Sequence, residues 1–311
     1  MASNQQPRTY AAAHFALELD GKKDVGLFRS IEGGGVKADV MTYQQGAHYD
    51  KWRSIGKPKF EDIKVQVGMA MSEPFYAWIS KFFDGIPDRK NGAIVAADFY
   101  YKERARREFT NAMIKEMTFP KLDATDDKAV YMSVALAVEG IVFKKGEGTE
   151  LQQNKGHNAQ KLWTARNFRL SLDGFEQACK RVVKIDSFTI KQNILEYHQG
   201  GFRAPTKMPS QIDFPTVSFY LPEADAAPFM KRFTERGING ERRGHAAQKA
   251  GMIQTFDTEK KELFTLEFFE ADIVGVTPDK SDAGSEDFKL VKIDLFTEKM
   301  KFTYASPPEL V

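Results

Sequence analysis

The sequence FALELDG at residues 15–21 returns as FRLSLDG at residues 168–174. In both stretches apolar residues alternate with other residues, and both stretches end in Asp-Gly. Alternation is typical of a half-buried β-strand, and Asp-Gly is typical of the tight turn that follows one. The repetition predicts that the chain contains two tandem copies of one β-rich unit.

A strand followed by a short helix is predicted next in each copy. Residues 63–67 alternate, and Ser72-Glu73-Pro74 then has the composition of a helix start. The predicted buried stripe of this helix is Phe75, Trp78, Ile79 and Phe82, and Gly85 is its predicted end.

The second copy repeats this order with weaker signals. Residues 217–219 alternate, Asp225 and Pro228 precede an apolar stripe, and Gly237 is the predicted end of the helix. The stripe consists of Phe229, Met230 and Phe233.

Three further strands complete each predicted copy. They are residues 94–102, 108–116 and 129–143 in the first copy, and 252–256, 263–274 and 288–302 in the second. The helix stands between early and late strands rather than after every strand. The fold class expected is therefore α+β, mostly antiparallel: two barrel or sandwich domains, each with about six strands and one short helix. We expect domains at 1–145 and 166–311, with a linker at 146–165 that is rich in Gly, Gln, Asn and Lys.

Composition excludes several classes of function. The 311 residues carry 45 Lys and Arg against 43 Asp and Glu, shared evenly between the halves, so a dedicated nucleic-acid or membrane-surface domain is not expected. Cys179 is the single cysteine, which excludes an internal disulfide and a cysteine-cluster metal site. No apolar run of 18 residues and no signal peptide near Met1 is found, which indicates a chain made and folded in the cytosol without membrane insertion.

No motif predicts a catalytic residue, a cofactor or a metal. The run Gly33-Gly34-Gly35 lacks the Gly-Lys-Ser/Thr ending of a phosphate loop and is better interpreted as a flexible strand end or a contact loop. The five histidines are scattered, and the adjacent Glu61 and Asp62 would face opposite sides of a strand. Lys180 and Arg181 could lower the pKa of Cys179, but no histidine is paired with that thiol in sequence.

Two basic clusters are predicted at hairpin tips. One is the run 102–107, with Arg104, Arg106 and Arg107, and the other contains Arg242 and Arg243. Each is either a solvated loop or a contact with a protein, DNA or cargo.

Residues 25–145 resemble the tail tube protein family of contractile phages and of phage-tail-like contractile injection systems. The resemblance is carried by IEGGGVKADV (31–40), IGKPKFEDIKVQVGMAMSEPFYAWI (55–79), FTNAMIKEM (109–117) and LDATDDKAVYMSVALAVEGI (122–141). It implies β-barrel units that join edge to edge into rings around a lumen, with rings stacked into an inner tube. It also implies that the segment Gly33–Lys59 reaches an adjacent subunit or ring. The contact candidates are Gly33, Gly34, Gly35, Tyr43, Tyr49, Trp52, Lys57, Lys59, Arg104, Arg106, Arg107, Arg242 and Arg243.

The resemblance implies a structural role rather than an enzyme. Implied partners are other copies of the chain, a contractile sheath, baseplate or spike proteins, and DNA or protein cargo in the lumen of a virion tail or tail-like particle. Two units per chain leave open a trimer with pseudo-sixfold symmetry or a hexamer. Two alternative functions also remain open: a tube-end adaptor or baseplate hub, and an effector or binding module carried in the lumen.

Overall fold

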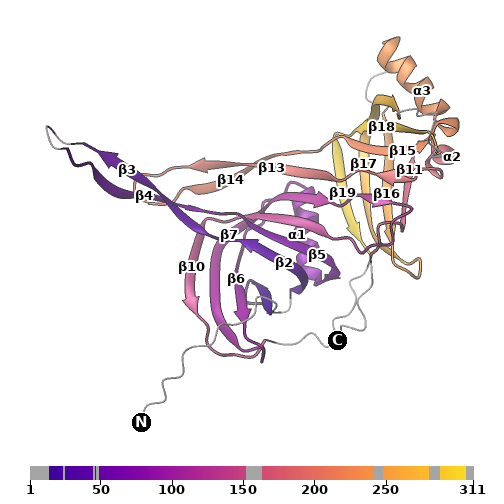
Figure 1. Cartoon of the computed structure of the whole chain (residues 1–311). Helices are drawn as coiled ribbons and strands as arrows, with labels where there is room; N and C mark the ends of the chain where they lie inside the picture. Colours follow the sequence, from indigo (N-terminus) through magenta and orange to yellow (C-terminus); the bar gives the residue numbers. More distant parts are fainter. Residues whose placement is uncertain are drawn as a thin grey trace.

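The computed structural model describes residues 14–23, 25–44, 46, 49–151, 163–240, 248–279 and 288–305. Two curled, barrel-like sheets lie side by side, each built mainly from one half of the chain (Figure 1). In the first unit the strand order is β1-β6-β7-β9-β5-β2, with β10 also beside β7. Its elements are β1 (Phe15–Leu19), β2 (Gly26–Gly33), β3 (Val36–Tyr43), β4 (Trp52–Phe60), β5 (Ile63–Met71), α1 (Glu73–Phe83), β6 (Lys90–Ala97), β7 (Glu103–Phe119), β8 (Leu122–Asp123), β9 (Met132–Ala137) and β10 (Gly140–Lys145).

The second unit repeats this topology. Its order is β11-β16-β17-β18-β15-β12, with β19 also beside β17. Its elements are β11 (Phe168–Leu172), α2 (Glu176–Cys179), β12 (Lys184–Ile185), β13 (Phe188–Tyr197), β14 (Thr206–Asp213), β15 (Val217–Pro222), η2 (Glu223–Asp225), α3 (Ala227–Phe233), η3 (Thr234–Ile238), β16 (Lys249–Phe256), β17 (Glu262–Pro278), β18 (Leu290–Phe296) and β19 (Lys299–Tyr304). The predicted antiparallel α+β fold with two similar units is confirmed.

The two units agree even in their irregularities. Gly92 pairs with Phe109 and Gly251 pairs with Phe268, and in both pairs the phenyl ring lies where a Cβ atom on the glycine would be. Asn111 in β7 and Glu270 in β17 both have a φ of +52°, which non-glycine residues rarely adopt. These matches support a common origin by duplication, which remains a prediction.

Helix α1 confirms the pattern that predicted it. Phe75, Trp78, Ile79 and Phe82 are buried, because they recur every three or four residues on one face. Gly85 has a φ of +69°, and its N–H donates to the carbonyl of Phe82 at 3.1 Å, as expected at a glycine-terminated helix end.

Several details of the expected elements were wrong. Gly237 does not end the second helix, because it lies inside the π-helical turn η3. The predicted strand 129–143 is two strands, β9 and β10, joined by a turn at residues 138–139. The predicted strand 288–302 is likewise divided into β18 and β19. An apolar run that continues through a tight turn cannot be divided by periodicity alone.

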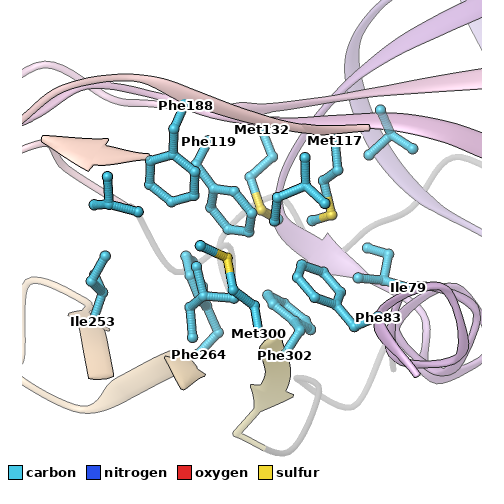
Figure 2. Close-up of a cluster of buried hydrophobic side chains, with 14 of the residues drawn as sticks. Ile79, Phe83, Met117, Phe119, Met132, Phe188, Ile253, Phe264, Met300 and Phe302 are labelled. Atoms are coloured by element: carbon cyan, nitrogen blue, oxygen red, sulfur yellow. The ribbon is translucent and has the colours of Figure 1, made fainter. Parts of the chain in front are cut away.

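The two units share one apolar core. Figure 2 shows side chains from both halves in a single cluster, including Phe83 and Phe119 from the first and Phe188 and Phe302 from the second. The end of the predicted linker is also packed, since Trp163 is buried and lies edge-on to Phe264, with ring centroids 5.1 Å apart. The division into domains at 145 and 166 remains a prediction. Within the described residues, no helix has the length and apolar character needed to cross a membrane.

Candidate assembly surfaces

The two units of the chain are joined by strand pairing. The end of β7 pairs antiparallel with the start of β13, with Phe119 opposite Phe188 and Met117 opposite Ile190. The hydroxyl groups of Thr118 and Thr189 lie 2.9 Å apart in this ladder. Strand β8 pairs in the same way with β12. The edge of one barrel-like unit is therefore covered by the edge of the next.

The β13–β14 hairpin extends this joint across the first unit (Figure 1). The backbone N–H of Lys207 donates to Glu139 Oε1 at 2.7 Å, and Arg89 Nη2 donates to the carbonyl of Lys207 at 2.8 Å. Near the base of the hairpin, Gln192 and Pro209 line a small surface cavity together with residues of α1 and β7. The joint thus combines a backbone ladder, an apolar core and a hairpin laid over the neighbouring unit.

The equivalent β3–β4 hairpin of the first unit projects away from both sheets (Figure 1). Its described residues include three of the predicted contact candidates, Tyr43, Tyr49 and Trp52, and all three side chains are exposed. Lys57 and Lys59 lie in β4. Hydrogen bonding to Asp39, at 2.7 Å, raises the pKa of Lys59. Tyr43, Tyr49 and Trp52 are not covered by any of the residues that the structure describes, and the predicted contact role of this hairpin remains a prediction.

The glycine run forms the junction between β2 and β3. Gly33 and Gly34 have φ values of +82° and +70°, and a Cβ atom on Gly33 would lie 2.1 Å from the carbonyl oxygen of Asp62. Glycine is therefore required here by the backbone itself. The carbonyl of Gly35 accepts a hydrogen bond from the N–H of Glu61 at 2.9 Å. The run is an ordered junction beside an uncovered strand, and its contact role remains a prediction.

The hairpin-tip position expected for Arg104, Arg106 and Arg107 was wrong. All three lie within β7, because the turn is formed at residues 99–101. Arg104 pairs with Asp98 at 2.6 Å, and Arg107 Nη1 donates to the carbonyl of Gly33 at 2.7 Å. These side chains hold the unit together, whatever contacts they also make with other chains. Arg242 and Arg243 lie outside the described residues.

Arg106 is the most enclosed member of this cluster. It pairs with Glu103 at 2.8 Å and with Glu18 at 2.6 Å, and hydrogen bonding to these two carboxylates raises the pKa of its guanidinium. Glu103 lies only three residues before Arg106, but the other partner, Glu18, lies 88 residues away and could not be found from the local sequence.

The polar groups considered for chemistry are held in structural roles. Cys179 is buried in α2, and burial raises the pKa of its thiol to about 12, so Lys180 and Arg181 do not activate it. Asp62 pairs with Lys115 at 2.7 Å, and Glu61 pairs with Lys37. Within the described part of the chain, no three His, Cys, Asp or Glu residues gather in an arrangement that could hold a metal ion.

Sequence reasoning missed one set of surface residues. Val36, Val40 and Ile55 on the β3–β4 hairpin and Val142 and Phe143 on β10 are exposed apolar side chains on the first unit. Their strands were not all predicted, and a strand pattern does not show which face remains uncovered. The signal that could have found them is the internal repeat, since the corresponding strands of the second unit cover the first unit.

Comparisons with known proteins give one family match and several likenesses to solved structures. None of the curated proteins compared with the sequence matches it. A chain from an extracellular contractile injection system, the PVC sheath–tube complex in its extended state, is 17% identical, with 44% of this chain and 92% of that chain covered and a TM-score of 0.38. A chain from the anti-feeding prophage cap, described as the AFP tube terminating cap, is 17% identical. The match covers 47% of this chain and 100% of that chain, with a TM-score of 0.39. Likenesses at these scores do not by themselves establish a shared fold.

The family comparison is more direct. Residues 11–142 match the family described as T4-like virus tail tube protein gp19, and this span contains β1 to β9 together with the uncovered hairpin. The matched residues end before the second unit begins. Over residues 11–142 the first unit of this chain is therefore similar to the T4-like virus tail tube protein family gp19.

Proposed function

We propose that the chain is a structural subunit of the inner tube of a contractile phage tail or contractile injection system. Copies join edge to edge into rings, and the rings stack around a lumen. The observation that carries this proposal is the pairing of β7 with β13, in which two tube-like units already meet edge to edge. Strand edges left unpaired at both ends of such a pair favour the addition of further copies.

Two units per chain define the ring that we expect. Three chains would supply six units in one pseudo-sixfold ring, whereas six chains would form a hexamer with two layers of units. The tube role further implies a surrounding contractile sheath, a baseplate or spike at one end, and DNA or protein passing through the lumen. Made in the cytoplasm, the chain would act as a component of the virion tail or tail-like particle, with no enzymatic step.

Assembly can be tested on the purified full-length chain. Negative-stain microscopy and light scattering over a hundredfold range of concentration should show rings, and then stacked rings, as the concentration increases. The mass of one ring distinguishes three chains from six. A monodisperse monomer at every concentration, also after addition of sheath and baseplate proteins of a contractile tail, would contradict the proposal.

A tube-end adaptor or baseplate hub is the second candidate. It is favoured by a chemical difference between the units: α1 and β7 present Trp78, Phe82 and Met113, whereas α3, η3 and β17 present the ion pairs of Arg232 and Arg236 with Asp272. A chain whose two units differ in this way suits a ring placed between unlike partners. Copy number decides between the candidates, because a tube protein polymerises into long tubes and an adaptor stops at one ring.

A further inference from the structure

We infer that the joint between the two units is repeated between chains, so that the second unit of one copy receives the first unit of another copy. The inference rests on the proposed ring assembly, and it identifies the two surfaces by which neighbouring chains would touch. The exit edge consists of Gly275–Pro278 at the end of β17 together with α3. The entry face consists of Gly34–Ala38, the β3–β4 hairpin, and Val142 and Phe143 of β10.

The residues of the new contact follow from the register shared by the two units. Val276 takes the place of Met117, because Val276 pairs with Ile293 in β18 as Met117 pairs with Val134 in β9. Likewise, Val36 takes the place of Ile190. Val36 lies two residues before the bulge that follows Ala38, and Ile190 lies two residues before the bulge that follows Gln192. Since Met117 pairs with Ile190, Val276 should pair with Val36 of the next chain.

Exposure differs at equivalent positions according to whether a partner unit is present. Ile190 is 0% exposed within the internal joint, and its counterpart Val36 is 39% exposed. Phe302 of β19 is 2% exposed because it stacks on Phe83 of α1, with ring centroids 5.8 Å apart. Its counterpart Phe143 in β10 is 62% exposed. The apolar residues of the entry face are thus those for which the same chain supplies no covering unit.

Backbone groups at both surfaces are also open to pairing. Gly275–Thr277 pair with β18 on one side, and Val36–Ala38 pair with β4 on one side. Among the described strands, none pairs with the other side of either segment. Pro278 has no N–H, so the ladder is expected to join Gly275–Thr277 to Gly35–Lys37 and to stop there.

The surface that would receive the β3–β4 hairpin is charged. Arg232 and Arg236 pair with Asp272 at 3.0 and 2.7 Å, where the internal joint has Trp78, Phe82 and Met113. The buried Nη1 of Arg236 has no acceptor among the described residues. A hairpin laid over this surface brings backbone carbonyl oxygens that can accept from such a donor. The charged surface of the second unit would thus favour the β3–β4 hairpin of a second copy. The apolar surface of the first unit is the one that receives the β13–β14 hairpin of the same chain.

Paired cysteines test the register directly. In the full-length double variant Val36→Cys, Val276→Cys, the two thiols of adjacent chains should lie on directly opposed residues and form a disulfide on mild oxidation. Non-reducing gels should then show a ladder of linked chains that disappears on reduction. The buried Cys179 is present in every variant and gives the background. The matched control is Val36→Cys, Val274→Cys, in which the second thiol is displaced by two residues along β17.

A second variant tests the contact without a covalent bond. Phe143→Ser should raise the concentration at which half of the chains are assembled by about tenfold or more, because it removes a central apolar contact. Tyr100→Ser, at a side chain that is 73% exposed but outside both surfaces, should leave assembly unchanged. Circular dichroism of each variant below the assembly concentration shows whether the monomer is folded.

The outcomes separate this inference from the proposed function. Rings together with a ladder that is specific to the Val36 and Val276 pair support both. Rings with no ladder, or with an equal ladder in the control pair, overturn the assigned joint and leave the tube role intact. An unmodified chain that never assembles overturns the tube role and the joint together.

Discussion

At the scale of single residues, the buried carboxylate of Glu103 shows how this fold accommodates charge. Its side chain is 1% exposed and accepts hydrogen bonds from Arg106 at 2.8 Å and from Thr149 at 2.9 Å. A buried carboxylate needs such partners, because burial removes its solvation. Hydrogen bonding to Arg106 is the main reason that the pKa of Glu103 lies below its ordinary value of 4.5.

Replacing this carboxylate should destabilise the chain in a pH-dependent way. Glu103→Gln should lower the free energy of unfolding at pH 7 by about 1–3 kcal/mol, since a charge-assisted hydrogen bond is lost. The contribution of Glu103 is complete above pH 4.5 and is lost as the pH falls through its lower pKa in the folded state. The difference from the unmodified chain should therefore narrow as the pH is lowered below 4.5.

Urea unfolding at a series of pH values measures this effect. Glu108→Gln is the matched control, because Glu108 forms a more exposed pair with Lys144 at 2.7 Å and should cost less than about 1 kcal/mol. If Glu103→Gln lowers the free energy of unfolding by the same amount at every pH, the role assigned to the charge of Glu103 is contradicted.

At the scale of elements, helix α1 links the first unit to the second. Tyr76 stacks on Tyr304 of β19 with ring centroids 4.4 Å apart, and its hydroxyl donates to the carbonyl of Met69 at 2.9 Å. The cap at the end of α1 fixes the position of the helix face that carries Tyr76. The N–H of Ile86 donates to the carbonyl of Lys81 at 2.9 Å, which completes the glycine-dependent cap around Gly85.

The cap can be tested by Gly85→Ala. A Cβ atom at this position would meet no other atom within 4 Å, so the cost arises from the positive φ alone. We expect a loss of about 1–2 kcal/mol in the free energy of unfolding, measured by thermal or urea denaturation. Gly200→Ala is the control, because Gly200 also has open space and lacks a positive φ. Equal stability of the two variants would show that α1 does not depend on this cap.

At the scale of the whole molecule, the two units share one apolar core, and we expect them to unfold together. Phe119 of β7 is buried, and its ring lies 5.1 Å from Phe188 and 5.9 Å from Phe264, both from the second unit. A subunit that must withstand force along a tube gains from such a joint, because neither unit can separate without exposing apolar surface.

Loss of the Phe119 ring should therefore weaken both units together. Phe119→Ala is expected to lower the free energy of unfolding by about 3–5 kcal/mol. Phe99→Ala, at an exposed side chain, should have little effect. In the unmodified chain, urea curves from tryptophan fluorescence and circular dichroism should coincide. Two separate transitions in that chain would contradict the single folding unit.

The sequence alone was sufficient to predict the units and much of their internal order. Alternation at Phe15 and Phe168, and the helical stripe from Phe75 to Phe82, depend on neighbouring residues and can be read locally. The repeat then predicted that two similar sheets exist, and the family resemblance implied that such units join other copies edge to edge. The β3–β4 hairpin was not predicted as strands, because all eight residues of β3 are exposed and its apolar residues do not mark a buried face.

Only the tertiary structure decided which edges meet. Thr118 and Thr189 are 71 residues apart and come together through the folding of both sheets, so no local pattern can indicate their pairing. Arg106 was expected at a hairpin tip, either solvated or in contact with another molecule, because its partner Glu18 lies 88 residues away. Local periodicity determines strands and helices, whereas pairing between distant strands and the exposure of Phe143 or Val36 depend on what the whole fold leaves uncovered.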